Sequence, residues 1–114
     1  MSSSKNKEPD TVIVIVATLF PASEHRDEVI AALETAAAKV QAAEDGTQLY
    51  AMHEGPDGRI VLIEKYADDA AFSAHRGGAG LAGLVTALDG KLSAPMDVQV
   101  LTPHPAGSEE KGTL

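Results

Sequence analysis

The run Thr11-Val-Ile-Val-Ile-Val-Ala-Thr-Leu19 is the most informative part of the sequence. Nearly every position in it is apolar and most are β-branched, which is typical of a strand with both faces covered. The segment Arg59-Ile-Val-Leu-Ile-Glu-Lys-Tyr66 has the same character in its first half. We therefore expect two strands whose two faces are both buried.

A helix is expected between these strands. Pro21 ends the first strand because it cannot donate a hydrogen bond to the ladder. Ser23 is a suitable N-cap, and the helix should run to about Ala43, before the turn residues Asp45-Gly46. The apolar residues of this segment recur at helical spacing and form one stripe: Val29, Ile30, Leu33, Ala37 and Val40.

Turn and cap signals place the remaining elements. Gly55-Pro-Asp-Gly58 is a strong turn signal between two strands. Asp68 is expected to cap a short helix, which is interrupted by the glycines that follow it. In chain order we expect a strand over 47–54, a strand over 59–66, a helix that begins after 68, a second helical piece over 81–88 and a strand over 95–102.

The order β-α-β-β-α-β predicts an α+β, ferredoxin-like fold with a four-stranded antiparallel sheet and both helices on one face. The helices can cover only one face, yet the strands are apolar on both. The simplest solution is a second copy, sheet against sheet, which gives a homodimer with a barrel-like core. We expect one domain over residues 11–103, a disordered tail over 1–10 and a flexible tail over 104–114.

Composition excludes several functions. The chain has 114 residues, no cysteine and a net charge of −8, so disulfides, thiolate metal sites and cysteine nucleophiles are ruled out. The acidic surface repels phosphate backbones and anionic lipids, and we expect no nucleic-acid partner. The apolar run Val12–Ala17 is far shorter than the roughly 20 residues of a membrane span. The polar start lacks the apolar core of a signal peptide, and we expect a cytoplasmic protein.

Three segments together resemble the antibiotic biosynthesis monooxygenase family. Among the branches of this family, the chain most resembles the small bacterial quinol monooxygenases. Glu44-Asp-Gly-Thr-Gln-Leu-Tyr50 resembles the family's Glu-x-Gly-x-x-x-Tyr entry to the second strand. The segment from Ile60 to His75 resembles its signature of a hydrophobic run, Glu, an aromatic residue and a later His. Val98-Gln-Val-Leu-Thr-Pro103 resembles the family's ending.

The resemblance implies a ferredoxin-like dimer with a pocket between sheet and helices in each subunit. Members of the family oxidise aromatic polyketides or quinols with O2 and use no metal, flavin or haem. Other branches degrade haem or isomerise a phosphorylated sugar derivative, so membership does not by itself give the reaction.

His75 and Glu64 are the candidate catalytic residues. An imidazole that lines a pocket suits proton abstraction near neutral pH. A carboxylate on the otherwise apolar strand face of Leu62 and Tyr66 is unusual, and desolvation there would raise its pKa. Each residue also has a structural interpretation, as a hydrogen-bonded helix histidine and as a paired carboxylate.

The candidate substrate-binding residues share an apolar or aromatic character: Tyr50, Tyr66, Phe72, Leu62 and Met52. The tyrosines could hydrogen-bond a quinol oxygen or stack on its ring, although core packing explains them nearly as well. The other histidines are not expected to act: His25, His53 and His104. No His, Asp or Glu set has metal-ligand spacing, and we expect no metal.

Two further patterns limit the interpretation. Gly78-Ala-Gly80-Leu-Ala-Gly83 fits a dinucleotide fingerprint, but a helix precedes it where a strand is required, so the glycines are better explained as a flexible joint. Polyketide-hydroxylating relatives have Asn, Trp and Tyr where this chain has Leu62, Tyr66 and Phe72. The haem-degrading branch has Asn, Trp and a His ligand where this chain has Ala17, His75 and approximately Val85, which makes a haem site improbable.

The sequence therefore predicts a cofactor-independent monooxygenase for a quinol or an aromatic phenolic or polyketide substrate. Two alternatives stay open. The same dimer could bind a small hydrophobic molecule or serve a stress response without catalysis, or it could be an isomerase that shuttles a proton without O2.

Overall fold

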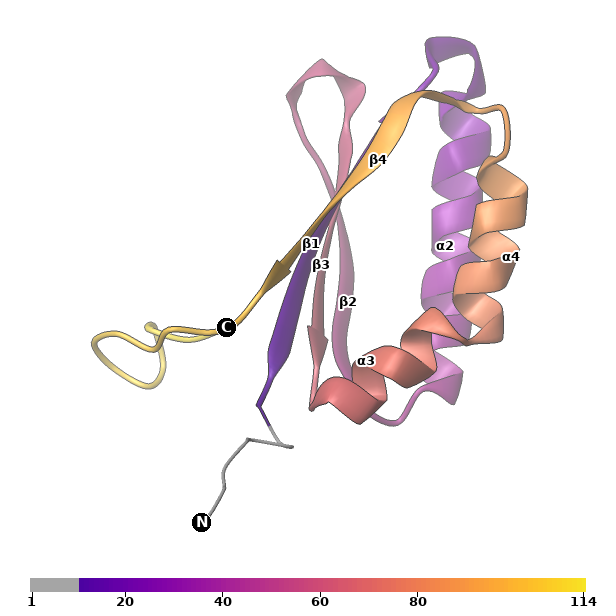
Figure 1. The fold of residues 1–114 in the computed structure, drawn as a ribbon. Coiled ribbons are helices and arrows are strands. Elements are labelled where there is room, and N and C mark those ends of the chain that lie inside the picture. The colour runs from indigo at the N-terminus through magenta and orange to yellow at the C-terminus, as the bar shows by residue number, and fades with distance from the viewer. Residues whose placement is uncertain (1–10) are drawn as a thin grey trace.

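The computed structural model describes residues 11–114, so the tail expected over residues 1–10 lies outside the described part of the chain (Figure 1). The element order confirms the predicted α+β fold of the ferredoxin-like type. The elements are β1 (Ile13–Pro21), the 3-10 turn η1 (Ser23–His25), α2 (Arg26–Ala43), β2 (Thr47–Glu54), the 3-10 turn η2 (Pro56–Gly58), β3 (Ile60–Tyr66), α3 (Asp69–Arg76), α4 (Ala79–Leu88) and β4 (Leu92–Leu101).

The four strands form one antiparallel sheet in the order β2-β3-β1-β4. The helices all lie on one side of it, with α2 and α4 next to each other (Figure 1). β1 pairs with β3 along one edge and with β4 along the other, which explains why its sequence is the most continuously apolar. The strand order is the one that the split βαβ pattern requires.

Side chains alternate across the sheet, and this divides it into a covered and an open face. On β1 the four residues Ile13, Ile15, Ala17 and Leu19 are buried beneath the helices. Their neighbours Val14, Val16 and Thr18 point to the opposite face and are half-buried. Val61 and Ile63 of β3 lie on that open face too, where no helix of residues 11–114 covers them. One chain thus buries one face of its sheet, and the second copy expected on the other face stays a prediction.

Several predicted boundaries were wrong: β1 begins at Ile13 and not at Thr11, and α4 begins at Ala79, two positions before its predicted start. Ser23 does not cap the first helix: it begins η1, and α2 starts only at Arg26, with no side-chain cap. The last strand begins at Leu92, three positions before its predicted start, because register shifts on β1 let Pro21 pair with Leu92. The predicted cap at Asp68 is confirmed, since its Oδ1 accepts a hydrogen bond of 2.8 Å from the amide of Ala71.

The chain beyond β4 contains no helix or strand and extends away from the helices (Figure 1). Its expected flexibility stays a prediction. Among residues 11–114, no helix combines the length and apolar character needed to cross a membrane.

Candidate active site

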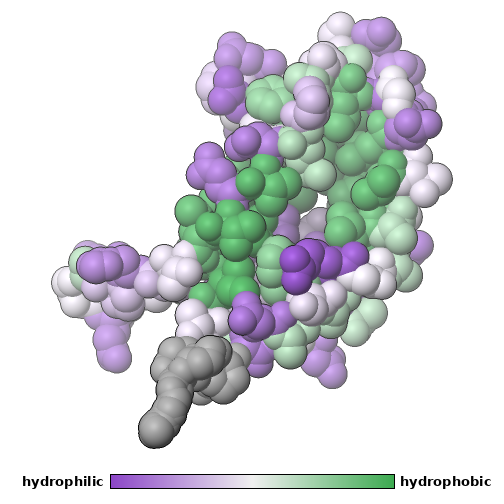
Figure 2. Space-filling view, viewed as in Figure 1, coloured by the Kyte–Doolittle hydropathy of each residue, from purple (hydrophilic) through white to green (hydrophobic). Residues whose placement is uncertain are grey.

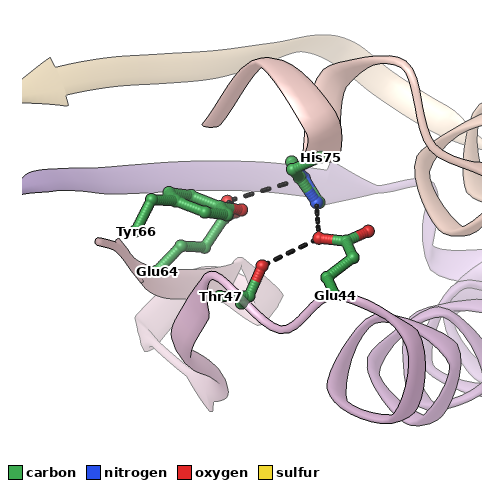
Figure 3. A network of polar contacts seen from close by, with 5 residues as sticks. All are labelled: Glu44, Thr47, Glu64, Tyr66 and His75. Atoms are coloured by element: carbon green, nitrogen blue, oxygen red, sulfur yellow. Dashed lines mark hydrogen bonds and ion pairs between the residues drawn. The ribbon is translucent and has the colours of Figure 1, made fainter. Parts of the chain in front are cut away.

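His75 lies in the last turn of α3 and is buried, with 4% of its surface exposed. Its side chain points away from solvent towards the sheet, between two carboxylates (Figure 3). On one side, Nδ1 lies 2.9 Å from Oε1 of Glu44. On the other side, Nε2 lies 3.9 Å from Oε1 of Glu64. The fold thus brings three ionisable groups from three elements to one place.

Glu44 directly follows α2 and fixes the orientation of the imidazole. Its Oε1 accepts a second hydrogen bond, of 2.8 Å, from Oγ1 of Thr47 (Figure 3). An ionised carboxylate can only accept, so the short contact to His75 requires a proton on Nδ1. This leaves Nε2 as the ring nitrogen that can exchange a proton with another molecule. Carboxylates commonly orient a catalytic histidine in this way.

Glu64 is the unusual residue of the sheet, a carboxylate in mid-strand with only 4% of its surface exposed. Its Oε1 accepts a hydrogen bond of 2.6 Å from the hydroxyl of Tyr66. Burial raises the pKa of Glu64, and the nearby charge of Glu44 raises it further, while the Tyr66 hydrogen bond and His75 oppose the rise. The distance to Nε2 of His75 is too long for a hydrogen bond, so the two side chains are not bonded to each other.

Two tyrosine rings flank the imidazole. The ring centroids of Tyr50 and Tyr66 lie 5.5 Å and 5.1 Å from that of His75. Burial is the main cause that raises the pKa of both hydroxyls, and the charge of Glu64 adds to it. Both tyrosines therefore stay neutral at physiological pH, and the hydroxyl of Tyr66 donates to Glu64. The rings also limit how the imidazole can turn.

An apolar cavity of about 230 Å³ opens beside these groups, between the sheet and the helices. Figure 2 shows the hollow between the apolar side chains of the sheet and those of the helix layer. Its lining is mostly aliphatic and aromatic, with the acid/base groups on one side. The lining residues are Ile15, Ala17, Tyr50, Leu62, Glu64, Phe72, His75, Arg76, Leu81, Leu84, Met96 and Val98.

Most predicted site residues meet at this cavity, but two do not line it. Tyr66 is fully buried, and its hydroxyl already donates to Glu64, so it supports the site from behind. Met52 lies near the β2 edge of the sheet and lines a separate, open groove along α2. The cavity ends at Tyr50 on this strand, and Met52 is two residues beyond it. Their predicted contact with substrate therefore has no support in the geometry.

Sequence reasoning missed Glu44 as a site residue. It was noted only as part of a motif, because 31 positions separate it from His75. One feature of the sequence could have identified Glu44, namely its position beside the turn at Gly46. This turn holds the end of α2 against α3. In contrast, His53 is exposed on β2, and Val85 is 58% exposed on α4. Within residues 11–114, no group of three or more His, Asp or Glu is placed to hold a metal ion.

The arrangement can move protons in a dry environment. Nε2 of His75 can accept a proton from a hydroxyl in the cavity, and the Glu44 carboxylate stabilises the imidazolium that forms. Glu64, with its raised pKa, supplies a second group that can hold or release a proton. Two such groups on one apolar cavity are a common feature of enzyme sites.

Comparison with known proteins gives a family and a fold. The family model described as antibiotic biosynthesis monooxygenase matches residues 12–83. The structure of Rv0793 from Mycobacterium tuberculosis is 28% identical, covers 86% of this chain and 100% of that chain, and superposes with a TM-score of 0.79. A candidate antibiotic biosynthesis monooxygenase from Caulobacter crescentus is 24% identical, covers 82% and 90% of the two chains, and has a TM-score of 0.77, which shows a shared fold. No curated protein matches the chain. The family match spans most of the folded chain and includes both His75 and Glu64, and we conclude that the protein belongs to the antibiotic biosynthesis monooxygenase family.

Proposed function

We propose that the protein is a monooxygenase that oxidises a small quinol or phenol with O2 and needs no bound cofactor. One observation carries this proposal: buried His75, oriented by Glu44, and buried Glu64 line an apolar cavity large enough for an aromatic ring. Family membership supports oxygenase chemistry in general, and the substrate is inferred from the site.

The first step is removal of a proton from the substrate hydroxyl. Nε2 of His75 accepts it, and the Glu44 carboxylate stabilises the resulting positive charge. The hydroxyl of Tyr50 can donate to the substrate oxygen and so hold the ring in place. The apolar lining keeps water away from the anion, which keeps it electron-rich. The protein thus contributes position, desolvation and one proton acceptor.

The anion then reacts with O2 directly. One electron passes from the phenolate to O2, and the two radicals combine to a hydroperoxide on a ring carbon. Loss of that carbon's proton and cleavage of the O–O bond release water and leave a carbonyl. In the overall reaction, one hydroquinone and one O2 give one hydroxyquinone and one water. The substrate supplies all four electrons that reduce O2. The last step needs a base for the carbon-bound proton and an acid for the leaving oxygen, roles that fit Glu64 and His75.

The cavity volume favours small substrates. A cavity of about 150 Å³ is enough to hold benzene. The 230 Å³ found here therefore fits a substituted single ring or a compact pair of fused rings. A four-ring polyketide would require the helices to move away from the sheet. This supports the quinol branch of the family over the polyketide branch.

Pairing of two chains through the open sheet face belongs to the same proposal. Val16 and Ile63 lie opposite each other and form the apolar centre of this face, while Lys65 and Asp97 lie towards its ends. A second copy would bury Val16 and Ile63 and hold the sheet that forms the floor of the cavity. A cytoplasmic location fits the absence of cysteine and stays a proposal too.

The proposal is tested by O2 uptake of the purified protein, treated with a chelator, on aromatic substrates of increasing size. We expect uptake above the buffer blank with single-ring and two-ring hydroquinones, and none above it with a four-ring anthrone. Equal rates with and without protein on every substrate would refute the oxygenase proposal.

A proton-transferring isomerase is the second candidate, because its chemistry needs the same acid/base pair and the same dry cavity. It is distinguished by substrate turnover that continues under argon at an unchanged rate. If ligands bind and are recovered unchanged in air, the protein is instead a binding module of the same fold.

A further inference from the structure

We infer that Arg76 is a recognition site for a negatively charged group, so that the preferred substrate is a phenol or quinol that carries a carboxylate. This inference rests on the proposed function and names the substrate class for the same cavity. It is based on the position of the guanidinium, on its contacts, and on its place relative to the acid/base groups.

Arg76 is the one Lys or Arg side chain among the residues that line the cavity, as far as residues 11–114 are described. It is the last residue of α3 and directly follows His75. Both residues line the cavity, His75 as a buried side chain and Arg76 as an exposed one. A substrate that touches both would bridge from solvent to the imidazole.

The guanidinium is held in place without being neutralised. Its central carbon lies 4.4 Å from the ring centroid of Phe72, another lining residue, and Nη2 donates a hydrogen bond of 3.1 Å to Oγ of Ser73. No carboxylate of the described residues forms an ion pair with it, although the chain has an excess of acidic residues. A planar guanidinium stacked on a ring keeps its remaining N–H edges free to bind a carboxylate in bidentate fashion.

The spacing of the rings fits a small bifunctional molecule. Phe72, His75 and Arg76 all line the cavity, and the Phe72 ring lies next to the guanidinium. Behind them, Tyr66 contacts both Phe72 and His75, with ring-centroid distances of 5.2 Å and 5.1 Å, and holds the two rings apart. One aromatic ring of a substrate can lie in the cavity beside Phe72, with its hydroxyl at His75 and its anionic group at Arg76. Arg76 also offsets the repulsion that an anion would meet from Glu44 and Glu64.

The test uses two probes that differ only in charge, 4-hydroxyphenylacetate and its neutral amide, whose dissociation constants are measured by NMR titration of the whole protein. We expect the carboxylate to bind at least about tenfold tighter, as a charge-assisted hydrogen bond implies. In Arg76→Gln the ratio should fall close to one, and Arg76→Lys should keep part of it. Added salt should reduce the ratio in the wild type.

Arg59→Gln is the matched control, because Arg59 also lies over a phenylalanine, 5.8 Å from the ring centroid of Phe20, but does not line the cavity. It should keep the wild-type ratio. Equal binding of the two probes, failure of both to bind, or the same loss of preference in Arg59→Gln would overturn the inference. Because binding is measured without turnover, O2 uptake on neutral hydroquinone reports separately on the proposed function.

Discussion

His75 owes its proposed role to residues that are distant in the sequence. Glu44 orients it from the end of α2, and Glu64 faces it from the middle of β3. Glu44 does not line the cavity, so we regard it as a positioning residue that acts through the imidazole. Glu64 lines the cavity and is a candidate catalytic residue. The two carboxylates should therefore respond differently to substitution.

Glu44→Gln should lower kcat/KM for a hydroquinone by on the order of 10²-fold, because the amide cannot stabilise the imidazolium. The pH profile of kcat/KM should also shift, which loss of packing alone would not cause. Asp45→Asn is the control, since Asp45 is the exposed neighbour in the same turn. Equal effects of the two substitutions would show that Glu44 does not act on His75.

Glu64 should make stability depend on pH in a defined direction. Its pKa is raised above the ordinary value of 4.5 in the folded state, so the folded chain holds this proton to higher pH than the unfolded chain. The stabilisation that comes from protonated Glu64 is fully present below the pKa of this carboxyl in the unfolded chain. It is lost as the pH rises through the pKa of Glu64 in the folded chain. Glu64→Gln should therefore gain stability relative to wild type over this window, by about 1.4 kcal/mol for each pH unit that separates the two values.

Urea denaturation of both proteins from pH 4 to pH 8 measures this difference. Carboxylates far from Glu64 contribute equally to both proteins and cancel in this difference. A difference that stays constant with pH would contradict a raised pKa for Glu64.

The helices form the other wall of the cavity, and α4 is held close to α2 by a glycine. A Cβ atom added at Gly80 would lie 2.9 Å from Cγ2 of the buried Val40. Gly80 thus allows α4 to pack closely against α2. The break between α3 and α4, which the glycines in the sequence predicted, lies just before it.

Gly80→Ala should lower the free energy of unfolding by about 1 kcal/mol or more, since overpacking outweighs the gain in helix propensity. Gly83→Ala, in the same helix, meets no atom within 4 Å and should raise stability by up to about 1 kcal/mol. Thermal or urea unfolding of both variants measures the two effects. If both alanines stabilise the protein equally, α4 does not pack against α2 through Gly80.

The strands and the cap at Asp68 could be predicted from the sequence because they depend on local patterns of burial and hydrogen bonding. The start of α2 could not, because η1 takes up Ser23 before the helix begins. Glu64 was found as a carboxylate on an apolar strand face, and His75 as the histidine that ends the matched family signature. Their partner Glu44 was missed because only tertiary structure brings the C-terminus of α2 against α3, and no local pattern encodes that contact.

Within residues 11–114 nothing covers one face of the sheet, and at the scale of the whole molecule the prediction of a dimer depends on this face. Val14, Val16, Val61 and Ile63 lie on this face and are only half-buried within one chain. A surface of this kind is commonly an interface in soluble proteins. A second copy is the simplest cover, because the same apolar face would be present on both partners.

Ile63→Lys should convert the protein from a dimer to a monomer, because the charge would be buried between two sheets. Analytical ultracentrifugation at micromolar concentration gives the mass. Val85→Lys is the control, since this valine is 58% exposed on α4, away from the sheet, and should leave the mass unchanged. A wild-type protein that sediments as a monomer would contradict the dimer.

The proposed mechanism depends on buried His75, which makes an aromatic substrate react with O2. Its most direct test is incorporation of ¹⁸O₂ into the product of a single-ring hydroquinone, followed by mass spectrometry, in His75→Gln and in His53→Gln, which changes an exposed histidine outside the cavity. We expect one labelled oxygen atom per product with wild type and His53→Gln, and product formation at the buffer rate with His75→Gln. Labelled product formed equally fast by the His75 variant would contradict a role of His75 in the reaction.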